Sequence, residues 1–230
     1  MDGRSMAFLQ KKSQEVVTSC FESGITRDNL LRCALTELEF FEAISQSLIE
    51  AAPPERAFAC AQGCDACCHQ RIACTVPEAI GIALGLSARS DEEIAGVAGR
   101  AREVHEKSAT LDPLARIRTG LPCPLLQDGA CSIYEMRPLA CRTVNSYDRK
   151  ACDRFFRAFA FDKPRPQWGT ITEATGQMLL GFGRALDSVG LDGGLVELSS
   201  ALAMILADPG LIDRYLAGER VFEAARPARH

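Results

Sequence analysis

The sequence lacks both a long hydrophobic run and a surplus of positive charge. None of its apolar stretches approaches the roughly 20 residues that a membrane-spanning helix requires, and its first residues become charged too soon for a secretory signal. The net charge of −4 and the isoelectric point of about 5.5 disfavour general binding to nucleic acid, which depends on neutralising phosphates. We therefore expect a cytoplasmic protein that binds neither membranes nor nucleic acid.

Several catalytic signatures are also missing. The sequence contains no Gly-x-Ser-x-Gly, no Gly-x-Gly-x-x-Gly and no phosphate-loop pattern. It has no internal repeat, no low-complexity tract and no alternation of strands with helices. The enzyme classes that depend on these signatures therefore have no support in the sequence.

Cysteine, by contrast, is abundant, with eleven residues in a chain of 230. In the cytoplasm thiols stay reduced, so a cysteine cluster indicates a metal site or catalysis more often than disulfides. Five cysteines lie within residues 60–74 and four within residues 123–152. Only Cys20 and Cys33 fall elsewhere, in a segment with helical periodicity, where we expect them to be buried as small apolar residues.

Apolar spacing predicts helices on both sides of the first cysteine cluster. Residues 8–50 have a helical period that Gly24 interrupts and Pro53-Pro54 ends. The segments 75–86 and 90–108 each begin with the pattern of a capping box. We expect these two helices to form a hairpin, which returns the chain to its start and brings the two cysteine clusters together.

The second cysteine-bearing segment, residues 121–153, is rich in turn signals. Asp128-Gly129 predicts a tight turn, which could join two very short strands. Pro138 can begin a helix that carries Cys141 in its first turn. Beyond Pro166 the pattern is helical again, with glycines that either weaken the first helix or permit close helix packing. The candidate helices there span residues 170–188, 193–206 and 208–217.

The predicted fold class is therefore mostly α, a helical domain around an irregular cysteine-rich metal-binding centre. The composition, 47% hydrophobic and 24% charged, is that of a soluble globular chain. We expect a single domain, 1–230, made of three parts in order. These are N-terminal helices at 8–50, the cysteine-rich core at 58–153 and C-terminal helices at 168–220.

Two known uses of closely spaced cysteines match only part of the pattern. Cys60-x3-Cys64-x2-Cys67 has the spacing of the radical S-adenosylmethionine motif. It lacks the usual aromatic residue before the last cysteine, where Ala66 stands, and no βα series follows. Cys64-Asp-Ala-Cys67 has the spacing of a thioredoxin-like dithiol, which requires a βαβ context that the sequence does not supply.

A metal site built from both clusters accounts for more of the cysteines. Thiolates are soft ligands that select zinc, copper(I) or iron–sulfur clusters. One zinc ion or one four-iron cluster takes four protein ligands, and the candidates exceed four, so either some thiols lie outside the coordination sphere or the centre holds more than one metal. The candidates are Cys60, Cys64, Cys67, Cys68, Cys123, Cys131 and Cys141.

The side chains of the adjacent pair Cys67-Cys68 should diverge, so we expect the two to bind different metals or different corners of one cluster. Four thiolates around a zinc ion or a four-iron core leave a net negative charge. Nearby basic residues could offset that charge, namely Arg71, Arg137, Arg142, Arg149 and Lys150.

The stretches CAQGCDACC and CPLLQDGACSIYEMRPLACR resemble the YkgJ-type cysteine-cluster proteins, whose shared region is described as a zinc- or iron-chelating domain. The resemblance covers about residues 60–145 and implies a metal held by the seven candidate cysteines. It also implies that Tyr134, Arg137, Pro138 and Arg142 form the scaffold around the last ligand. Flagellin lysine methylases carry a similar cluster that is associated with iron–sulfur binding. The family as a whole has no firmly assigned reaction.

Two functions follow as alternatives. The first is an iron–sulfur or iron centre with redox or metal-dependent modifying activity, acting on a protein or small-molecule partner. The second is a structural zinc site in a non-catalytic protein whose helical surface binds a partner. The sequence leaves open whether the chain is an enzyme, and whether Cys74, Cys152 and His69 belong to the ligand set.

Overall fold

The computed structural model describes residues 2–227 of the protein, apart from the side chains of residues 113 and 114. This part of the chain contains ten α-helices and four strands of two residues each, so the fold is mostly α, as the sequence predicts. No helix within it is both long and apolar enough to cross a lipid bilayer.

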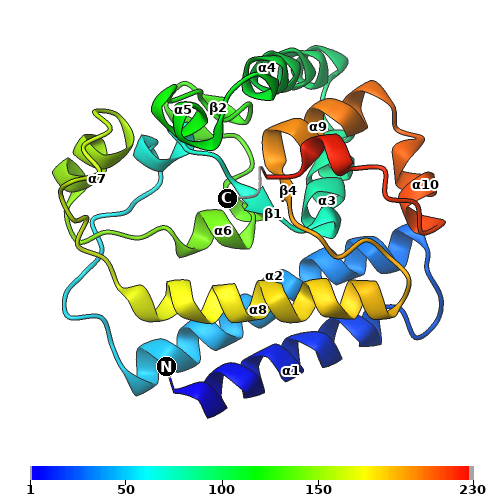
Figure 1. The fold of residues 1–230 in the computed structure, drawn as a ribbon, viewed down its shortest axis with the longest axis horizontal. Coiled ribbons are helices and arrows are strands. Elements are labelled where there is room, and N and C mark those ends of the chain that lie inside the picture. Colours follow the sequence, from blue (N-terminus) through cyan, green and yellow to red (C-terminus); the bar gives the residue numbers. More distant parts are fainter. Residues whose placement is uncertain (1, 228–230) are drawn as a thin grey trace.

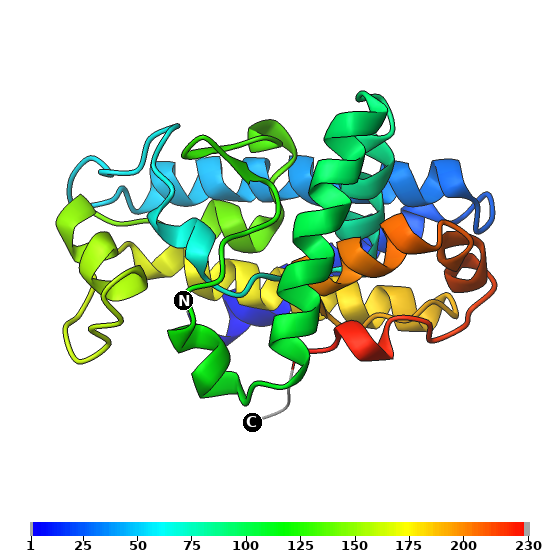
Figure 2. The ribbon, with the colours of Figure 1, turned by 90° about the horizontal axis from the view of Figure 1, so that it is seen from above.

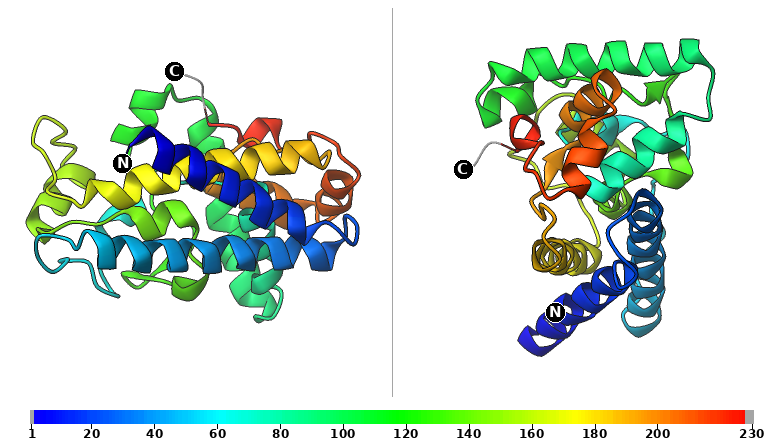
Figure 3. Two further views of the ribbon diagram at one scale, coloured as in Figure 1. Left: turned by 90° about the horizontal axis from the view of Figure 1, so that it is seen from below. Right: turned by 90° about the vertical axis from the view of Figure 1, so that its right-hand side faces the viewer.

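Three long helices form one layer of the protein (Figures 1 and 3). They are α1 (Gly3–Cys20), α2 (Arg27–Ala51) and α8 (Gly169–Ser188). α1 packs most extensively against α8, and α2 contacts both. Two N-terminal helices thus share a layer with one that begins at residue 169.

The opposite layer is centred on α9 (Leu198–Ala207), which contacts α3 (Val76–Leu86), α4 (Asp91–Ala109) and α10 (Leu211–Leu216). α3 also packs on α2 and so joins the two layers. Figure 3 shows this arrangement from the end of the molecule. α3 is apolar on nearly every side, which suits a helix buried between layers.

Both predicted capping boxes are confirmed. Thr75 accepts a hydrogen bond from the Glu78 backbone and Glu78 accepts one from the Thr75 backbone. Ser90 and Glu93 make the same reciprocal pair at the start of α4. Each box satisfies backbone donors that the first turn of a helix leaves unpaired. Each of the two helices packs more extensively against α9 than against the other, so α9 holds the expected pair in place.

The cysteine-rich segments lie at one end of the long helices, as Figure 2 shows from above. Their elements are short. They are the 3-10 helices η1 (Ala66–His69) and η2 (Tyr134–Met136), the strands β2 (Leu126–Gln127) and β3 (Ala130–Cys131), and the helices α5 (Pro113–Arg118), α6 (Leu139–Thr143) and α7 (Arg149–Phe156).

The sequence did not predict the pairing of β1 (Ala73–Cys74) with β4 (Val196–Glu197), which is antiparallel with Ala73 opposite Glu197. The expected helix over 193–206 is therefore wrong at its start, since α9 begins only at Leu198. Backbone contact explains the difference. A Cβ on Gly193 would stand 2.0 Å from the carbonyl oxygen of Gly183, so this glycine serves the approach of the loop to α8.

α5 and α7 were also not expected, because no helix was predicted over residues 113–118 and the start of α7 lies in the segment 121–153, which is rich in turn signals. Each is a short helix in a charged stretch. α7 begins at Asp148, whose side chain accepts a hydrogen bond from the Lys150 backbone, and its buried face carries Ala151, Cys152 and Phe156. A helix of eight residues has too few periodic positions for the sequence to reveal it.

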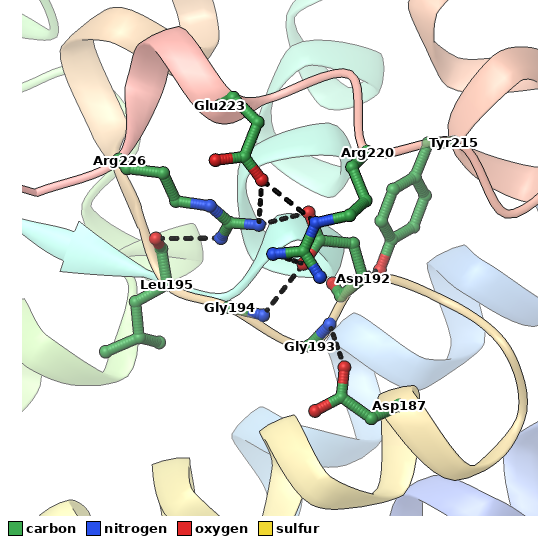
Figure 4. Close-up of polar contacts among 9 residues, drawn as sticks. All are labelled: Asp187, Asp192, Gly193, Gly194, Leu195, Tyr215, Arg220, Glu223 and Arg226. Atoms are coloured by element: carbon green, nitrogen blue, oxygen red, sulfur yellow. Dashed lines mark hydrogen bonds and ion pairs between the residues drawn. The ribbon is translucent and has the colours of Figure 1, made fainter.

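The chain after α10 is tied back to the α8–β4 loop by a polar network around Asp192 (Figure 4). The Asp192 carboxylate, only 1% exposed, pairs with Arg226 and accepts a hydrogen bond from the Gly194 backbone. Tyr215 donates from its hydroxyl to the Asp192 carbonyl oxygen at 3.1 Å. These contacts hold η3 (Glu223–Ala225) and Arg226 over the start of β4.

The close approach of α1 and α8 depends on a glycine. A Cβ on the buried Gly181 would stand 2.5 Å from both the Gln10 carbonyl oxygen and the Ser13 Cβ. Gly176, one and a half turns earlier in α8, is exposed and has no atom within 4 Å of a Cβ at its position. The two glycines therefore separate the steric effect of a methyl group from its effect on helix propensity.

We expect Gly181→Ala to lower the free energy of unfolding by about 1–3 kcal/mol, because α1 and α8 must move apart. Gly176→Ala is the matched control and should be neutral or stabilising by up to about 1 kcal/mol, because alanine favours the helix. Urea denaturation followed by circular dichroism measures both. Equal effects of the two substitutions would contradict the predicted contact.

Candidate metal centre

The first cysteine cluster is a turn followed by a single turn of 3-10 helix. Gly63 has a φ of +82°, a conformation that glycine adopts without steric cost, and the Cys64 backbone donates to the Ala61 carbonyl oxygen. The Cys68 backbone then donates to the Asp65 carbonyl oxygen at 2.9 Å, which closes η1. Four thiols thus project from one compact loop.

The second cluster is built on a hairpin and a short helix. β2 pairs with β3 around Asp128 and Gly129, whose φ values are +50° and +75°, as expected for an Asp-Gly turn. Cys131 ends this hairpin. Pro138 is the N-cap of α6, so Cys141 lies in its first turn, as predicted.

A backbone hydrogen bond joins the two clusters. The Cys123 N–H donates to the Cys68 carbonyl oxygen at 2.7 Å. The thiols around this junction fall into two groups with Cys67 between them. Cys67 interacts electrostatically with Cys60 and Cys152, which in turn interact with Cys64, and these three thiols form one group. Cys67 also interacts with Cys123, Cys131 and Cys141, which form the other group.

The structure therefore brings all seven predicted cysteines within electrostatic reach of at least one other thiol. The expected divergence of Cys67 and Cys68 is wrong, because the interaction with the neighbouring Cys68 thiol is the largest influence that raises the pKa of Cys67. That both thiols ligate a metal remains a prediction.

Without a cation these thiols favour the protonated form. Burial raises the pKa of Cys123 to about 11, and the pKa of Cys141 is raised well above its ordinary value for the same reason. The charges of neighbouring thiolates raise both further. Thiolates packed this closely need positive charge beside them, and a metal ion supplies it directly.

Several arginines lie close enough to lower the pKa of individual thiols. Arg137 does so for Cys67 and Cys131, and its guanidinium stacks 3.5 Å from the centre of the Tyr134 ring. Arg142 also interacts electrostatically with Cys141, as expected of a residue that offsets thiolate charge. It donates to the carbonyl oxygens of Glu135 and Arg137 and so supports the η2 loop.

The remaining basic residues differ from expectation. Arg149 and Lys150 are exposed at the start of α7, and Arg71 borders other cavities. Three arginines distant in sequence take their place, each lowering the pKa of one cysteine. These are Arg89 for Cys131, Arg100 for Cys123 and Arg165 for Cys152.

The donor set fits a soft metal in its chemistry. All eleven cysteines are free thiols, so none of the predicted ligands is lost to a disulfide. Among residues 2–227, no group of three or more cysteine, histidine or acidic side chains is already placed as one coordination sphere. The thiols would therefore have to turn their side chains toward a shared ion, which free thiols on short loops can do.

His69 has one nitrogen suited to such an ion. Its Nδ1 lies 3.3 Å from the Gly120 carbonyl oxygen and, because a carbonyl only accepts, Nδ1 is the donor. In the neutral ring Nε2 then carries the free lone pair. This buried atom has no hydrogen-bond partner among the described residues, and the Asp65 carboxylate lies 3.7 Å from it. A backbone carbonyl on the other ring nitrogen is the usual support of a ligating histidine.

The cysteines outside the predicted set divide into three kinds. Cys152 on α7 packs with Cys64 and Cys67 and belongs to the cluster in space, a contact that its position in the sequence does not reveal. Cys74 is fully buried beside the second group. Cys20 and Cys33 are buried between α1 and α2, away from both groups, as expected of small apolar residues.

Comparison with known proteins also indicates that this region binds a metal. Residues 59–160 match the family model CxxCxxCC, described as "Putative zinc- or iron-chelating domain". These residues are a CxxCxxCC domain. No curated protein and no solved structure matches the chain. The domain begins next to Cys60 and ends beyond α7, so it contains every thiol of the two groups around Cys67.

Two buried carboxyl groups connect the CxxCxxCC domain to the long helices. Glu78 accepts a hydrogen bond from the Leu139 backbone at 2.7 Å and so fixes the start of α6. Thr75 donates from its hydroxyl to Glu37 at 3.0 Å, which links α2 to the start of α3. Burial raises the pKa of Glu37 well above its ordinary value of 4.5, and the charge of Glu78 raises it further.

An acid with a higher pKa in the folded chain binds more protons when folded. Its contribution to stability is complete below the unfolded pKa of about 4.5 and is lost as the pH rises toward the folded pKa. We therefore expect the free energy of unfolding to fall as the pH rises above the unfolded pKa of about 4.5. Glu37→Gln should reduce the decrease of the unfolding free energy with pH by up to about 1.4 kcal/mol per pH unit.

Urea denaturation at several pH values, on protein of equal metal content, measures the slope. Glu39→Gln is the matched control, since Glu39 lies on the exposed face of the same helix. A Glu37→Gln protein with the slope of the parent would contradict the raised pKa.

Proposed function

We propose that this chain is a cytoplasmic metalloprotein whose cysteine centre holds iron, as an iron–sulfur cluster or a related iron centre. In this proposal the centre serves redox or metal-dependent modifying chemistry on a protein or small-molecule partner. When bound, such a centre supplies electron transfer or a Lewis-acidic iron. The observation that carries the proposal is the position of Cys67 between two groups of three thiols.

The number of thiols favours iron over a single zinc ion. A zinc tetrahedron uses four ligands. The two groups hold three free thiols each, and Cys67 makes seven. A polynuclear centre can use more donors, with Cys67 as a member common to both sides. The predicted ligands remain Cys60, Cys64, Cys67, Cys68, Cys123, Cys131 and Cys141.

The surrounding residues suit an anionic centre. Arg137, Arg89 and Arg100 stand beside the second group, where their charges would offset the negative charge of a thiolate-bound cluster. Cys123 and Cys141 are partly buried, which limits the access of water to the same side. Cys60 is exposed, which leaves the first group as the side that a partner can approach.

A structural zinc site is the alternative. The elements that carry the cysteines are too short to be stable alone, since β2 and β3 have two residues each and α6 has five. A zinc ion bound by their cysteines would hold these elements together and contribute folding free energy. In that case the chain would be non-catalytic, and its helical surface would bind a partner.

Metal identity separates these functions. Protein purified under anaerobic conditions should be brown, with a broad visible absorption band, bound iron and acid-labile sulfide. Elemental analysis of protein expressed without added metal measures the iron and zinc content. A colourless protein that holds zinc would contradict the iron centre and support the structural alternative.

Removal of the shared thiol tests the ligand set under both functions. We expect Cys67→Ser to abolish metal loading, because Cys67 is the thiol common to both groups, and Cys64→Ser to do the same. Cys20→Ser is the control and should retain the full metal content, since Cys20 lies between α1 and α2. Unchanged metal stoichiometry in folded Cys67→Ser protein would refute the predicted set.

A further inference from the structure

A second polar site lies apart from the cysteine centre, in a cavity of about 180 Å³. It is bordered by five segments, namely the chain just before β1, α4 and its C-terminal end, α5, β4 with the start of α9, and the C-terminal segment. Its volume is well above the roughly 15 Å³ that one water molecule requires, so a small ion can enter. The polar residues around it are Arg71, His105, Ser108, Arg116, Glu197, Ser200 and Arg226.

Arg116 is buried without enough hydrogen-bond acceptors. Only 3% of the residue is exposed. Its Nη2 donates to the Glu197 carboxylate at 2.9 Å, but Nε and Nη1 are buried and have no partner among the described residues. A guanidinium stays charged and offers five N–H donors. Buried donors that lose water without gaining a partner are costly, so these two nitrogens call for an acceptor in the cavity.

The charge around the cavity is also unbalanced. Arg116 is matched by Glu197, and Arg226 is matched by Asp192, to which it is held as Figure 4 shows. Arg71 borders the cavity and forms no ion pair or side-chain hydrogen bond with any other described residue. The site therefore carries one positive charge that no described acidic side chain compensates.

The neutral polar groups add further hydrogen-bonding capacity. His105 Nδ1 lies 2.9 Å from the Ser200 hydroxyl, so each orients the other at the cavity wall. The five contributing segments are far apart in the sequence, and only the folded chain assembles them. Arginine is the side chain best suited to an oxyanion, because its planar fork matches two oxygen atoms.

We propose that this cavity binds a small oxyanion, a phosphate or carboxylate group, held by Arg116 and Arg71. The free nitrogens of Arg116 supply directed hydrogen bonds, and Arg71 supplies the uncompensated charge. The ligand is a free anion or the anionic group of a small metabolite. The site is independent of the metal and of the function proposed for the cysteine centre.

Calorimetric titration of the purified full chain with inorganic phosphate, and separately with acetate, tests the proposal. We expect saturable binding of at least one of them. Arg71→Gln should weaken it by about tenfold or more, because a charge-assisted contact is lost. Arg116→Lys should weaken it to a similar extent, because lysine keeps the pairing with Glu197 but loses the fork.

Arg102→Gln is the matched control, since Arg102 lies on α4 with 74% of its side chain exposed and should not affect binding. Binding of phosphate alone identifies a phosphate site, and binding of acetate alone identifies a carboxylate site. If Arg116→Lys does not fold, Arg71→Gln still decides the question. No saturable binding of either anion, or equal affinity in Arg71→Gln and Arg102→Gln, would overturn the proposal.

Discussion

The hydrogen bond from the Cys123 backbone to the Cys68 carbonyl oxygen is the contact on which the metal centre depends. It joins two segments that 54 residues separate in the sequence. Through it, Cys67 comes to lie between thiols of both segments. The intervening helices can sustain this junction because α3 and α4 are each anchored on α9, and α3 also on α2.

The helical body and the cysteine centre meet at Glu78. Its carboxylate closes the capping box of α3 and also accepts the backbone hydrogen bond of Leu139. One buried side chain thus serves the start of a core helix and the start of the short helix that carries Cys141. Glu37 binds the hydroxyl of Thr75, the residue that caps α3, so α2 supports the same point from the other layer. The long helices therefore act as the rigid base for loops that have little regular structure.

Arginines lie both beside the thiols and around the polar cavity near β4. Arginines from separate elements approach the thiols, although the chain as a whole is acidic. A separate set of arginines surrounds the polar cavity near β4. Arg71 lies two residues before β1, and Glu197 is the last residue of β4. The small β1–β4 ribbon therefore lies beside this second set of arginines. Beside the thiols the arginines face the negative charge of thiolates, and around the cavity a bound anion would compensate them.

The sequence by itself determined the features that depend on neighbouring residues. The two capping boxes, the Asp128-Gly129 turn, the helix begun by Pro138 and the mostly α class follow from local backbone chemistry. The cysteine spacing also identified the domain. Only the tertiary structure decided what depends on distant contacts. The pairing of β1 with β4, the addition of Cys152 to the cluster and the charges of Arg89 and Arg100 beside the thiols come from segments that packing brings together, and a local pattern carries no record of them.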